Sequence, residues 1–185
     1  MTPRFWTLVM MVLTAAASRL VPHPPNFTPI GALALFSCAH FSDKRLAFAV
    51  PLAALFLGDL AMGLYAGMIW VYASFVLIGC IGLSLRNRRR AGPIIAATLA
   101  SSLLFYAVTN FGVWAAGVLY PRTAAGFLEC YVAAIPFFGN TLLGDGVYSA
   151  VLFGGFALAE YRFHTLRQPA LLASASAGFE TFASK

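Results

Sequence analysis

Charged residues are scarce in this chain, and several other features are missing as well. Lys, Arg, Asp and Glu make up only 10% of the 185 residues, while 61% are hydrophobic. A water-soluble enzyme needs more charge on its surface, so the composition excludes that class. The sequence has no G-x-x-x-x-G-K-[ST] loop, and so no ATP-hydrolysing motif of its own. Its three cysteines are too few and too scattered for a disulfide framework, and no C-x-x-C pair indicates a structural zinc site.

Long apolar runs dominate what remains. A membrane-crossing helix needs about 20 apolar residues. The runs are continuously apolar rather than alternating, which excludes a β-barrel. The second run is short for a crossing, so we expect it either to be poorly tilted or to lie partly inside the bundle. The sequence predicts an all-α integral membrane protein, a bundle of six transmembrane helices over residues 5–20, 29–41, 46–64, 68–85, 93–119 and 135–161.

Basic residues are spread unevenly over the connections, which predicts the orientation. With the N-terminus inside, ten of the twelve Lys and Arg residues are cytoplasmic, and only Arg19 and Arg122 lie on the outer side. This asymmetry requires an even number of spans with both termini cytoplasmic. We expect a multi-pass protein of the inner membrane, with a transmembrane domain over residues 1–164 and a polar tail over 165–185. The basic loop 86–90 then faces anionic lipid, and nucleic acid is not an expected partner.

The outer connections carry side chains that indicate a ligand site. Four prolines stiffen the loop 21–29, and a stiff loop loses little entropy when it closes over a ligand. An interfacial belt remains an alternative explanation for part of the aromatic residues. The predicted small-molecule site is open to the outside and is formed by His23, Asn26, Phe27, Tyr72, Asn110, Trp114, Tyr120, Arg122, Asn140 and Asp145.

Two carboxylates, Asp59 and Asp145, lie within predicted spans, in the outer half of the bundle. Intramembrane acids are costly and normally have partners. They can accept hydrogen bonds from a ligand, join helices or bind protons, and the sequence leaves these roles open. No Lys or Arg lies in the cores of the predicted spans, so we expect no basic partner for either acid.

Cys80 lies in the fourth predicted span between Gly79 and Gly82. A lone cysteine in a membrane helix is usually a small packing residue. Two flanking glycines, however, would let a flat, bulky group approach the thiol. Sulfur is a soft ligand that suits a transition metal. A single thiol would serve as one axial ligand of a metal whose other ligands come with a macrocycle.

These features resemble the BtuM-type cobalamin transporters, which are similar to the S-components of energy-coupling factor (ECF) vitamin transporters. The resemblance covers residues 5–161 and rests on six spans, Cys80, the loop Pro22-His23-Pro24-Pro25-Asn26-Phe27 and the segment Asn110-Phe111-Gly112-Val113-Trp114. It implies uptake of cobalamin or a related corrinoid such as cobinamide, without a dedicated ECF module. It also implies that the Cys80 thiolate is an axial cobalt ligand and can promote loss of an upper ligand such as cyanide (decyanation).

Three other functions compete with corrinoid uptake. An S-component for another vitamin, such as a flavin, would leave Cys80 as a packing residue. A membrane enzyme would use Asp59, Asp145 and His23 as acid–base groups, but no intramembrane histidine or metal cluster accompanies the acids. A structural scaffold would not need polar side chains at the outer site. The visible spectrum of the purified protein distinguishes a bound corrinoid from a flavin and from no ligand.

Overall fold

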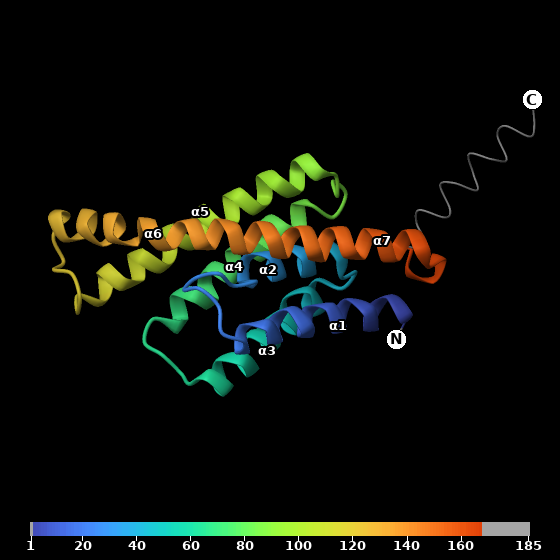
Figure 1. The fold of residues 1–185 in the computed structure, drawn as a ribbon, viewed down its shortest axis with the longest axis horizontal. Coiled ribbons are helices and arrows are strands. Elements are labelled where there is room, and N and C mark those ends of the chain that lie inside the picture. The colour runs from blue at the N-terminus through green and yellow to red at the C-terminus, as the bar shows by residue number, and fades with distance from the viewer. Residues whose placement is uncertain (1, 168–185) are drawn as a thin grey trace, which may run out of the picture.

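The structure is a computed structural model in which residues 2–167 are described; of the predicted polar tail, 168–185 lie outside the described residues. Every regular element within residues 2–167 is helical, which confirms the all-α prediction. Figure 1 shows an elongated bundle. Its main helices are α1 (Pro3–Ala17), α2 (Ile30–His40), α3 (Lys44–Met62), α4 (Met68–Ser84), α5 (Ala91–Ala116), α6 (Ala124–Ser149) and α7 (Gly155–Arg162). Three short segments accompany them: η1 (Ser18–Leu20), η2 (Ala150–Gly154) and η3 (His164–Leu166).

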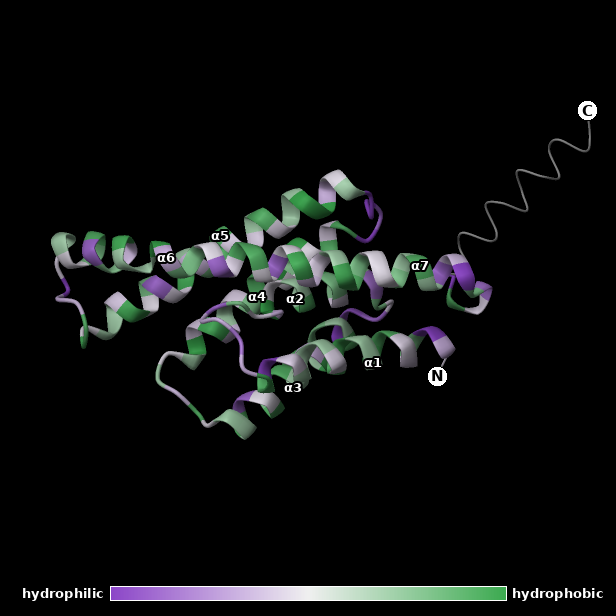
Figure 2. Cartoon of the chain, in the orientation of Figure 1, coloured by the Kyte–Doolittle hydropathy of each residue, from purple (hydrophilic) through white to green (hydrophobic). Residues whose placement is uncertain are grey.

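Within residues 2–167, three helical stretches are long and apolar enough to cross a membrane. They are Lys44–Met62, Ala91–Ala116 and Ala124–Arg162, the last formed by α6, η2 and α7 in succession. The helices α2 and α4 are apolar but shorter. Figure 2 shows the helices largely in hydrophobic colours, with the hydrophilic residues gathered in connections and towards the end of α7. This arrangement is compatible with a bundle of membrane-spanning helices.

The short helix α2 forms the centre of the bundle. All eleven of its residues are buried, and at a rise of 1.5 Å per residue it is only about 16 Å long. A helix that is apolar on every side must be surrounded by protein or lipid. Here the neighbours are protein, because α4 approaches so closely that a Cβ on Gly82 would lie 2.8 Å from Leu35 O. Of the two alternatives given for the second run, a poor tilt or a place partly inside the bundle, the structure shows the place inside the bundle.

The helix α6 begins at Ala124, eleven residues before the predicted start at Ile135. The predicted start at Ile135, next to Pro136, lies in the interior of this helix. The start is set instead by Thr123, whose hydroxyl accepts a hydrogen bond from the backbone N–H of Gly126 at 3.1 Å. Glu129, predicted to lie in an outer connection, is therefore a helical residue.

The two ends of the bundle differ in charge. Arg4 of α1 forms an ion pair with Glu160 of α7, so the first and last helices meet at one end. The loop 85–90 and its arginines lie at this same end (Figure 1). We call this the basic end. The opposite end, which we call the loop end, holds the proline-rich loop 21–29 and the turns 63–67 and 117–123.

Candidate functional site

The proline-rich loop at the loop end is held against α6. Asn140 Nδ2 donates a hydrogen bond to Pro25 O at 2.9 Å. A Cβ on Gly144 would lie only 3.0 Å from Thr28 N, so the loop backbone approaches the helix where a side chain is missing. The ring of Phe27 lies 6.0 Å from that of Tyr148, measured between centroids. The loop is therefore anchored to α6 by a hydrogen bond, a close backbone approach and a ring contact.

Other polar groups of this loop point outwards. His23 and Asn26 are both exposed. His23 Nδ1 donates to Val21 O at 2.7 Å within the loop itself. Asn26 has a backbone φ of 63°, in the left-handed region that asparagine tolerates better than most residues. The tip of the loop thus presents an imidazole and an amide on the surface of the protein.

Asp145 joins three helices beneath this loop. Its carboxylate is 2% exposed and accepts hydrogen bonds from Ser102 Oγ of α5 at 2.7 Å and from the backbone N–H groups of Gly31 and Ala32. No side chain caps α2 at its own N-cap residue, Pro29. A buried helix start needs acceptors for its free N–H groups, and its dipole favours a negative charge there. Asp145 supplies both from α6, so its oxygens are engaged in holding the bundle together.

Asp59 has a basic partner, contrary to the sequence prediction. Arg19 Nη2 donates to Asp59 Oδ1 at 2.7 Å, and the side chains of Arg19 and Asp59 are 7% and 0% exposed. Tyr72 OH donates to the other carboxylate oxygen, Oδ2, at 2.9 Å. Arg19 was predicted to lie on the outer side. Instead, η1 continues the end of α1 and directs this arginine into the bundle. Among the predicted ligand residues, Tyr72 is therefore bound to a buried acid.

Tyr65, in the turn between α3 and α4, lies near the same ion pair. Burial raises the pKa of its phenol, and the negative charge of Asp59 raises it further. Tyr65 consequently stays protonated at neutral pH and keeps its hydrogen-bond donor. Its position extends the polar region around Arg19 and Asp59 towards the loop end.

Aromatic rings form a cluster where α5 turns into α6. Trp114 lies 5.6 Å from Phe111 and 5.3 Å from Phe127 between ring centroids. Trp114 Nε1 donates to Thr123 O at 3.3 Å. Arg122 Nη2 donates to Ala116 O at 3.1 Å and so satisfies a carbonyl at the end of α5. These contacts connect the turn between α5 and α6 to both helices.

Two further predicted ligand residues lie on the hairpin formed by α5, the turn 117–123 and α6. Asn110 Nδ2 donates to Tyr106 O, one turn earlier in its own helix, at 2.8 Å. Tyr120 is half-buried in the turn 117–123. The predicted ligand residues thus divide into three groups: the loop with α6, the Arg19–Asp59 pair with Tyr72, and the α5–α6 hairpin. The structure brings each group together separately.

Cys80 is exposed on the outer surface of α4. Val76 and Leu77, which are 41% and 46% exposed, share this face. The flanking glycines face the other way: a Cβ on Gly79 would overlap the ring of Phe48, and one on Gly82 would strike Leu35 O. The glycines therefore allow α2 and Phe48 to pack against α4. Helix packing explains the two glycines. They make no space for a ligand beside the exposed thiol of Cys80.

The remaining two cysteines are buried. Cys38 Sγ donates to Ala47 O at 3.6 Å, and Cys130 Sγ donates to Asn110 O at 3.5 Å. Within residues 2–167, no group of three or more His, Cys, Asp or Glu side chains is arranged to hold a metal ion. Cys80 is thus the thiol with open access, and a metal bound there would bring its other ligands with it.

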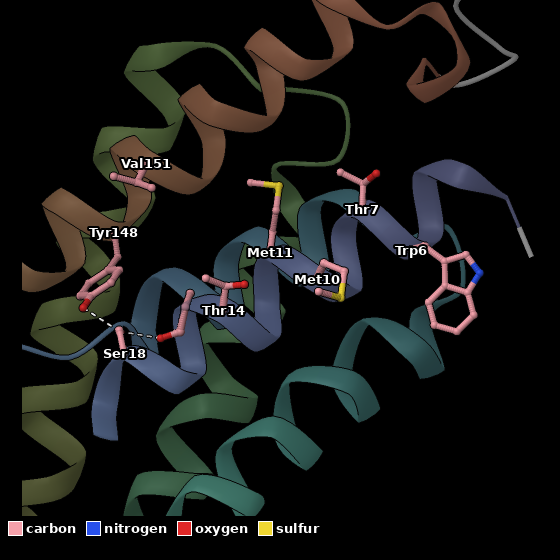
Figure 3. A pocket seen from close by; sticks show the side chains of 9 residues that line it. Trp6, Thr7, Met10, Met11, Thr14, Ser18, Tyr148 and Val151 are labelled. Atoms are coloured by element: carbon pink, nitrogen blue, oxygen red, sulfur yellow. Dashed lines mark hydrogen bonds between the residues drawn. The ribbon is translucent and has the colours of Figure 1, made fainter. Parts of the chain in front are cut away.

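A groove of about 620 Å³ lies between α1 and α6. Figure 3 shows Trp6 near one end of it and, near the other, Ser18, whose hydroxyl lies 2.7 Å from Tyr148 OH. Met10, Met11 and other apolar side chains form most of its wall. None of the predicted ligand residues lines this groove.

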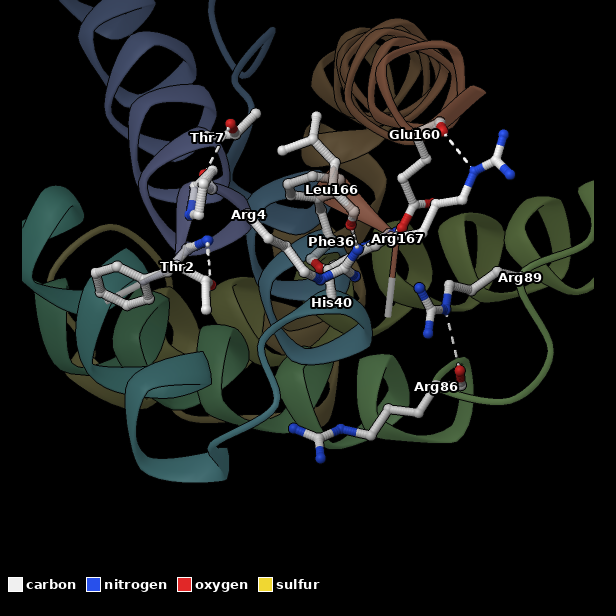
Figure 4. A network of polar contacts seen from close by, with 12 residues as sticks. Thr2, Arg4, Thr7, Phe36, His40, Arg86, Arg89, Glu160, Leu166 and Arg167 are labelled. Carbon is white, nitrogen blue, oxygen red and sulfur yellow. Dashed lines mark hydrogen bonds and ion pairs between the residues drawn. The ribbon is translucent and has the colours of Figure 1, made fainter. Parts of the chain in front are cut away.

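Polar contacts at the basic end tie α1, α2 and α7 together (Figure 4). Arg4 donates to Glu160 and to Leu166 O, and its guanidinium lies 4.8 Å from the centroid of the Phe156 ring. His40 Nδ1, at the end of α2, donates to Phe36 O at 3.0 Å. Arg86 donates to Cys38 O and Phe41 O, carbonyls at the end of α2. Both ends of the buried helix α2 therefore have charged partners, Asp145 at its N-terminus and Arg86 at its C-terminus.

Comparison with known proteins identifies the family and nothing narrower. A model of DUF6580, a family of unknown function, matches residues 1–171, so the chain belongs to this family. No curated protein matches the sequence, and no solved structure matches the fold.

Proposed function

We propose that this member of the DUF6580 family is a six-span inner-membrane protein that binds a corrinoid from the outer side for uptake. In this proposal the basic end and both termini are cytoplasmic, and the loop end faces outwards. The chain resembles the S-components of ECF transporters in its number of spans and, more narrowly, the BtuM-type cobalamin transporters. In this proposal the energy for transport comes from outside this chain, because its sequence has no ATP-binding loop.

The observation that carries the proposal is the anchored loop at the end opposite the basic cluster. Basic residues are retained on the cytoplasmic side of a membrane, so a loop at the other end faces outwards. A loop held by Asn140 and Gly144 is already ordered before a ligand arrives, and a ligand loses less binding energy in ordering it. His23 and Asn26 on this loop offer hydrogen-bonding groups that match the amides along a corrinoid edge.

The exposed thiol of Cys80 supports a corrinoid over other vitamins. A thiolate in an apolar span is costly, and coordination to a metal stabilises it. Tyr72 and Cys80 are eight positions apart on α4, a rise of about 12 Å. The cobalt ligand therefore lies deeper in the membrane than the loop end, and the two parts of the proposal need separate tests.

The test of the metal ligand is the visible spectrum of the protein purified after incubation with cobinamide. Cys80→Ser keeps the size of the side chain but replaces soft sulfur with a poorer donor. We expect Cys80→Ser to change the corrinoid spectrum and to reduce the bound amount. Cys130→Ala is the matched control, because it removes a buried thiol and should leave the spectrum as in the unchanged protein. Equal loading with an unchanged spectrum in Cys80→Ser would remove the ligand role, and a bound flavin would favour an S-component of another specificity.

The test of orientation uses cysteines introduced at the two ends. A cysteine at Pro24, on the loop, should react with a membrane-impermeant maleimide in intact cells. A cysteine at Arg88, in the exposed part of the basic loop, should react only after the membrane is opened. Both reactions are measured in a variant in which Cys80 is replaced by serine. Labelling of the Arg88 position from outside would reverse the proposed orientation.

A further inference from the structure

A second groove, of about 610 Å³, lies between α5 and the continuous helix formed by α6, η2 and α7. Its wall is apolar and contains small residues, including Ala91 of α5 and Gly146, Ala150 and Gly154 opposite. Apart from the adjoining residues of the same helix, no atom of residues 2–167 lies within 4 Å of the position that a Cβ would take on Gly146 or Gly154. The groove is therefore open where these side chains are missing, and other parts of the described chain do not fill it.

The hydroxyl groups inside the groove are already satisfied. Thr98 Oγ1 donates to Ser149 Oγ at 3.1 Å and also lies 2.9 Å from Ile94 O in its own helix. Both hydroxyls therefore have a hydrogen-bond partner within the protein, and the rest of the interior is apolar. The lining runs from Leu142 to Ala157, a rise of about 22 Å. One leaflet of hydrocarbon is about 15 Å thick, half of the bilayer core. An extended acyl chain fits this length.

The charged groups stand at one end of the groove. Arg89 is the charged residue among those that line it, and the exposed Arg90 follows at the N-cap of α5. Burial lowers the pKa of Arg89, and the nearby Arg4 contributes, while Glu160 has the opposite effect. An arginine keeps its charge through such a change. Glu160, the acid whose charge acts on Arg89, already forms an ion pair with Arg4.

The N-terminus of α5 lies at the same end. No side chain caps it, and its first turn carries no acidic residue. The backbone N–H groups of Ala91 and Gly92 are therefore not neutralised by the N-cap side chain or by an acid of the first turn. The start of a 26-residue helix carries a partial positive charge and favours an anion, phosphate in particular. Arginine side chains and the helix start thus add up to a cationic site at the mouth of an apolar groove.

We propose that this groove binds an anionic phospholipid from the leaflet at the basic end. The acyl chain lies between α5 and the α6–α7 helix, and Arg89, Arg90 and the first N–H groups of α5 hold the phosphate. The inference follows from charge complementarity, since a ligand that fits must be apolar along its length and anionic at one end. It is independent of the corrinoid proposal.

The experiment is native mass spectrometry of the full chain, purified in detergent and mixed with equal amounts of phosphatidylglycerol and phosphatidylcholine that carry the same acyl chains. We expect phosphatidylglycerol to be retained about fivefold over phosphatidylcholine, the effect of about one favourable arginine contact. Gly154→Leu should fill the groove and reduce retention about fivefold. Gly139→Leu is its control, because Gly139 also has open space at its Cβ position but does not line the groove.

A second pair of variants tests the phosphate contact. Arg90→Gln, at the start of α5, should reduce the preference for phosphatidylglycerol about fivefold. Arg88→Gln removes an equally exposed charge two positions earlier and should leave the preference within twofold of the unchanged protein. Glycerol 3-phosphate in millimolar excess should not displace the lipid.

Three results would overturn the proposal. Equal retention of the two lipids would mean that the cationic mouth selects nothing, as expected of a groove that receives a partner helix. Equal retention by Gly154→Leu and Gly139→Leu would place the lipid elsewhere. Displacement by glycerol 3-phosphate would make the site one for a free phosphate.

Discussion

Asp59 and Asp145 are both almost completely buried, yet they are stabilised in different ways. Asp59 is neutralised by a full charge, because Arg19 forms an ion pair with it and Tyr72 adds a hydrogen bond. Asp145 has neutral donors only: the Ser102 hydroxyl and two backbone N–H groups at the start of α2. A buried acid can therefore be held by a side chain from another helix or by the end of a helix.

The hydrogen-bond partners of the two acids also bear on function. An acid that serves as a general base, or that binds a ligand, needs an oxygen free to do so. Both oxygens of Asp59 have partners in the bundle, and Asp145 has three donors. His23 Nδ1 is bound within its own loop. These contacts favour the helix-joining role of the two acids over the acid–base site that a membrane enzyme would need.

Removing the basic partner of Asp59 should have the largest effect. Arg19→Met leaves a buried carboxylate without its counter-charge, and breaking a buried pair in this way costs about 3–5 kcal/mol. We expect a correspondingly lower free energy of unfolding, measured by thermal unfolding in detergent. The double variant Arg19→Met, Asp59→Asn should recover most of the loss. Arg122→Met, at an exposed arginine, is the control, and an equal loss in both single variants would show that the ion pair is not special.

A side chain at Gly31 should test how closely Asp145 approaches α2. A Cβ there would lie 2.5 Å from Asp145 Oδ1, so Gly31→Ala must displace the carboxylate or the helix start. Overpacking of this kind costs about 1–3 kcal/mol. Gly146→Ala, next to Asp145 but with open space at its Cβ position, should instead be neutral or stabilising by up to about 1 kcal/mol. If thermal unfolding gave the same result for both variants, Asp145 would not be fixed against α2.

The smallest effects should come from the single hydroxyl donors. Tyr72→Phe and Ser102→Ala each remove one hydrogen bond to a carboxylate, and interhelical hydrogen bonds in membrane proteins average about 0.6 kcal/mol. We expect similar small losses of stability from the two variants, because each acid keeps its other partners. A loss above about 2 kcal/mol in one variant alone would place the main stabilisation of that acid in its hydroxyl donor. Tyr72→Phe also separates structure from binding: weaker corrinoid loading at unchanged stability would give Tyr72 a ligand role.

Local sequence patterns predicted much of the fold. Five of the six predicted spans match helices to within a few residues. The exception is α6, which begins at Ala124, eleven residues before the predicted start, with Thr123 as its N-cap residue. The central place of α2 was also foreseen in part, because a run too short to cross comfortably, with no polar face, has few other positions open to it.

The candidate site was less accessible to prediction. Arg19 was counted as an outer charge, and its pairing with Asp59 depends on η1 packing against α3, forty positions later in the chain. Gly79 and Gly82 were interpreted as space for a ligand, whereas Phe48 and Leu35 occupy that side of α4. The anchoring of Pro25 by Asn140 joins residues 115 positions apart. In each case the contacting residue is distant in the sequence, and the local sequence pattern does not indicate it.

The sequence by itself determined that the chain forms helices apolar enough for a membrane bundle, with most of its basic residues at one end. These properties depend on hydrophobicity and charge summed over neighbouring residues, which any helix in a membrane must satisfy. Only the tertiary structure decided which groups share the buried acids, which face of α4 packs and which stays open, and where grooves remain. Those outcomes depend on the rotation and depth of each helix relative to the others, and packing between distant segments sets both.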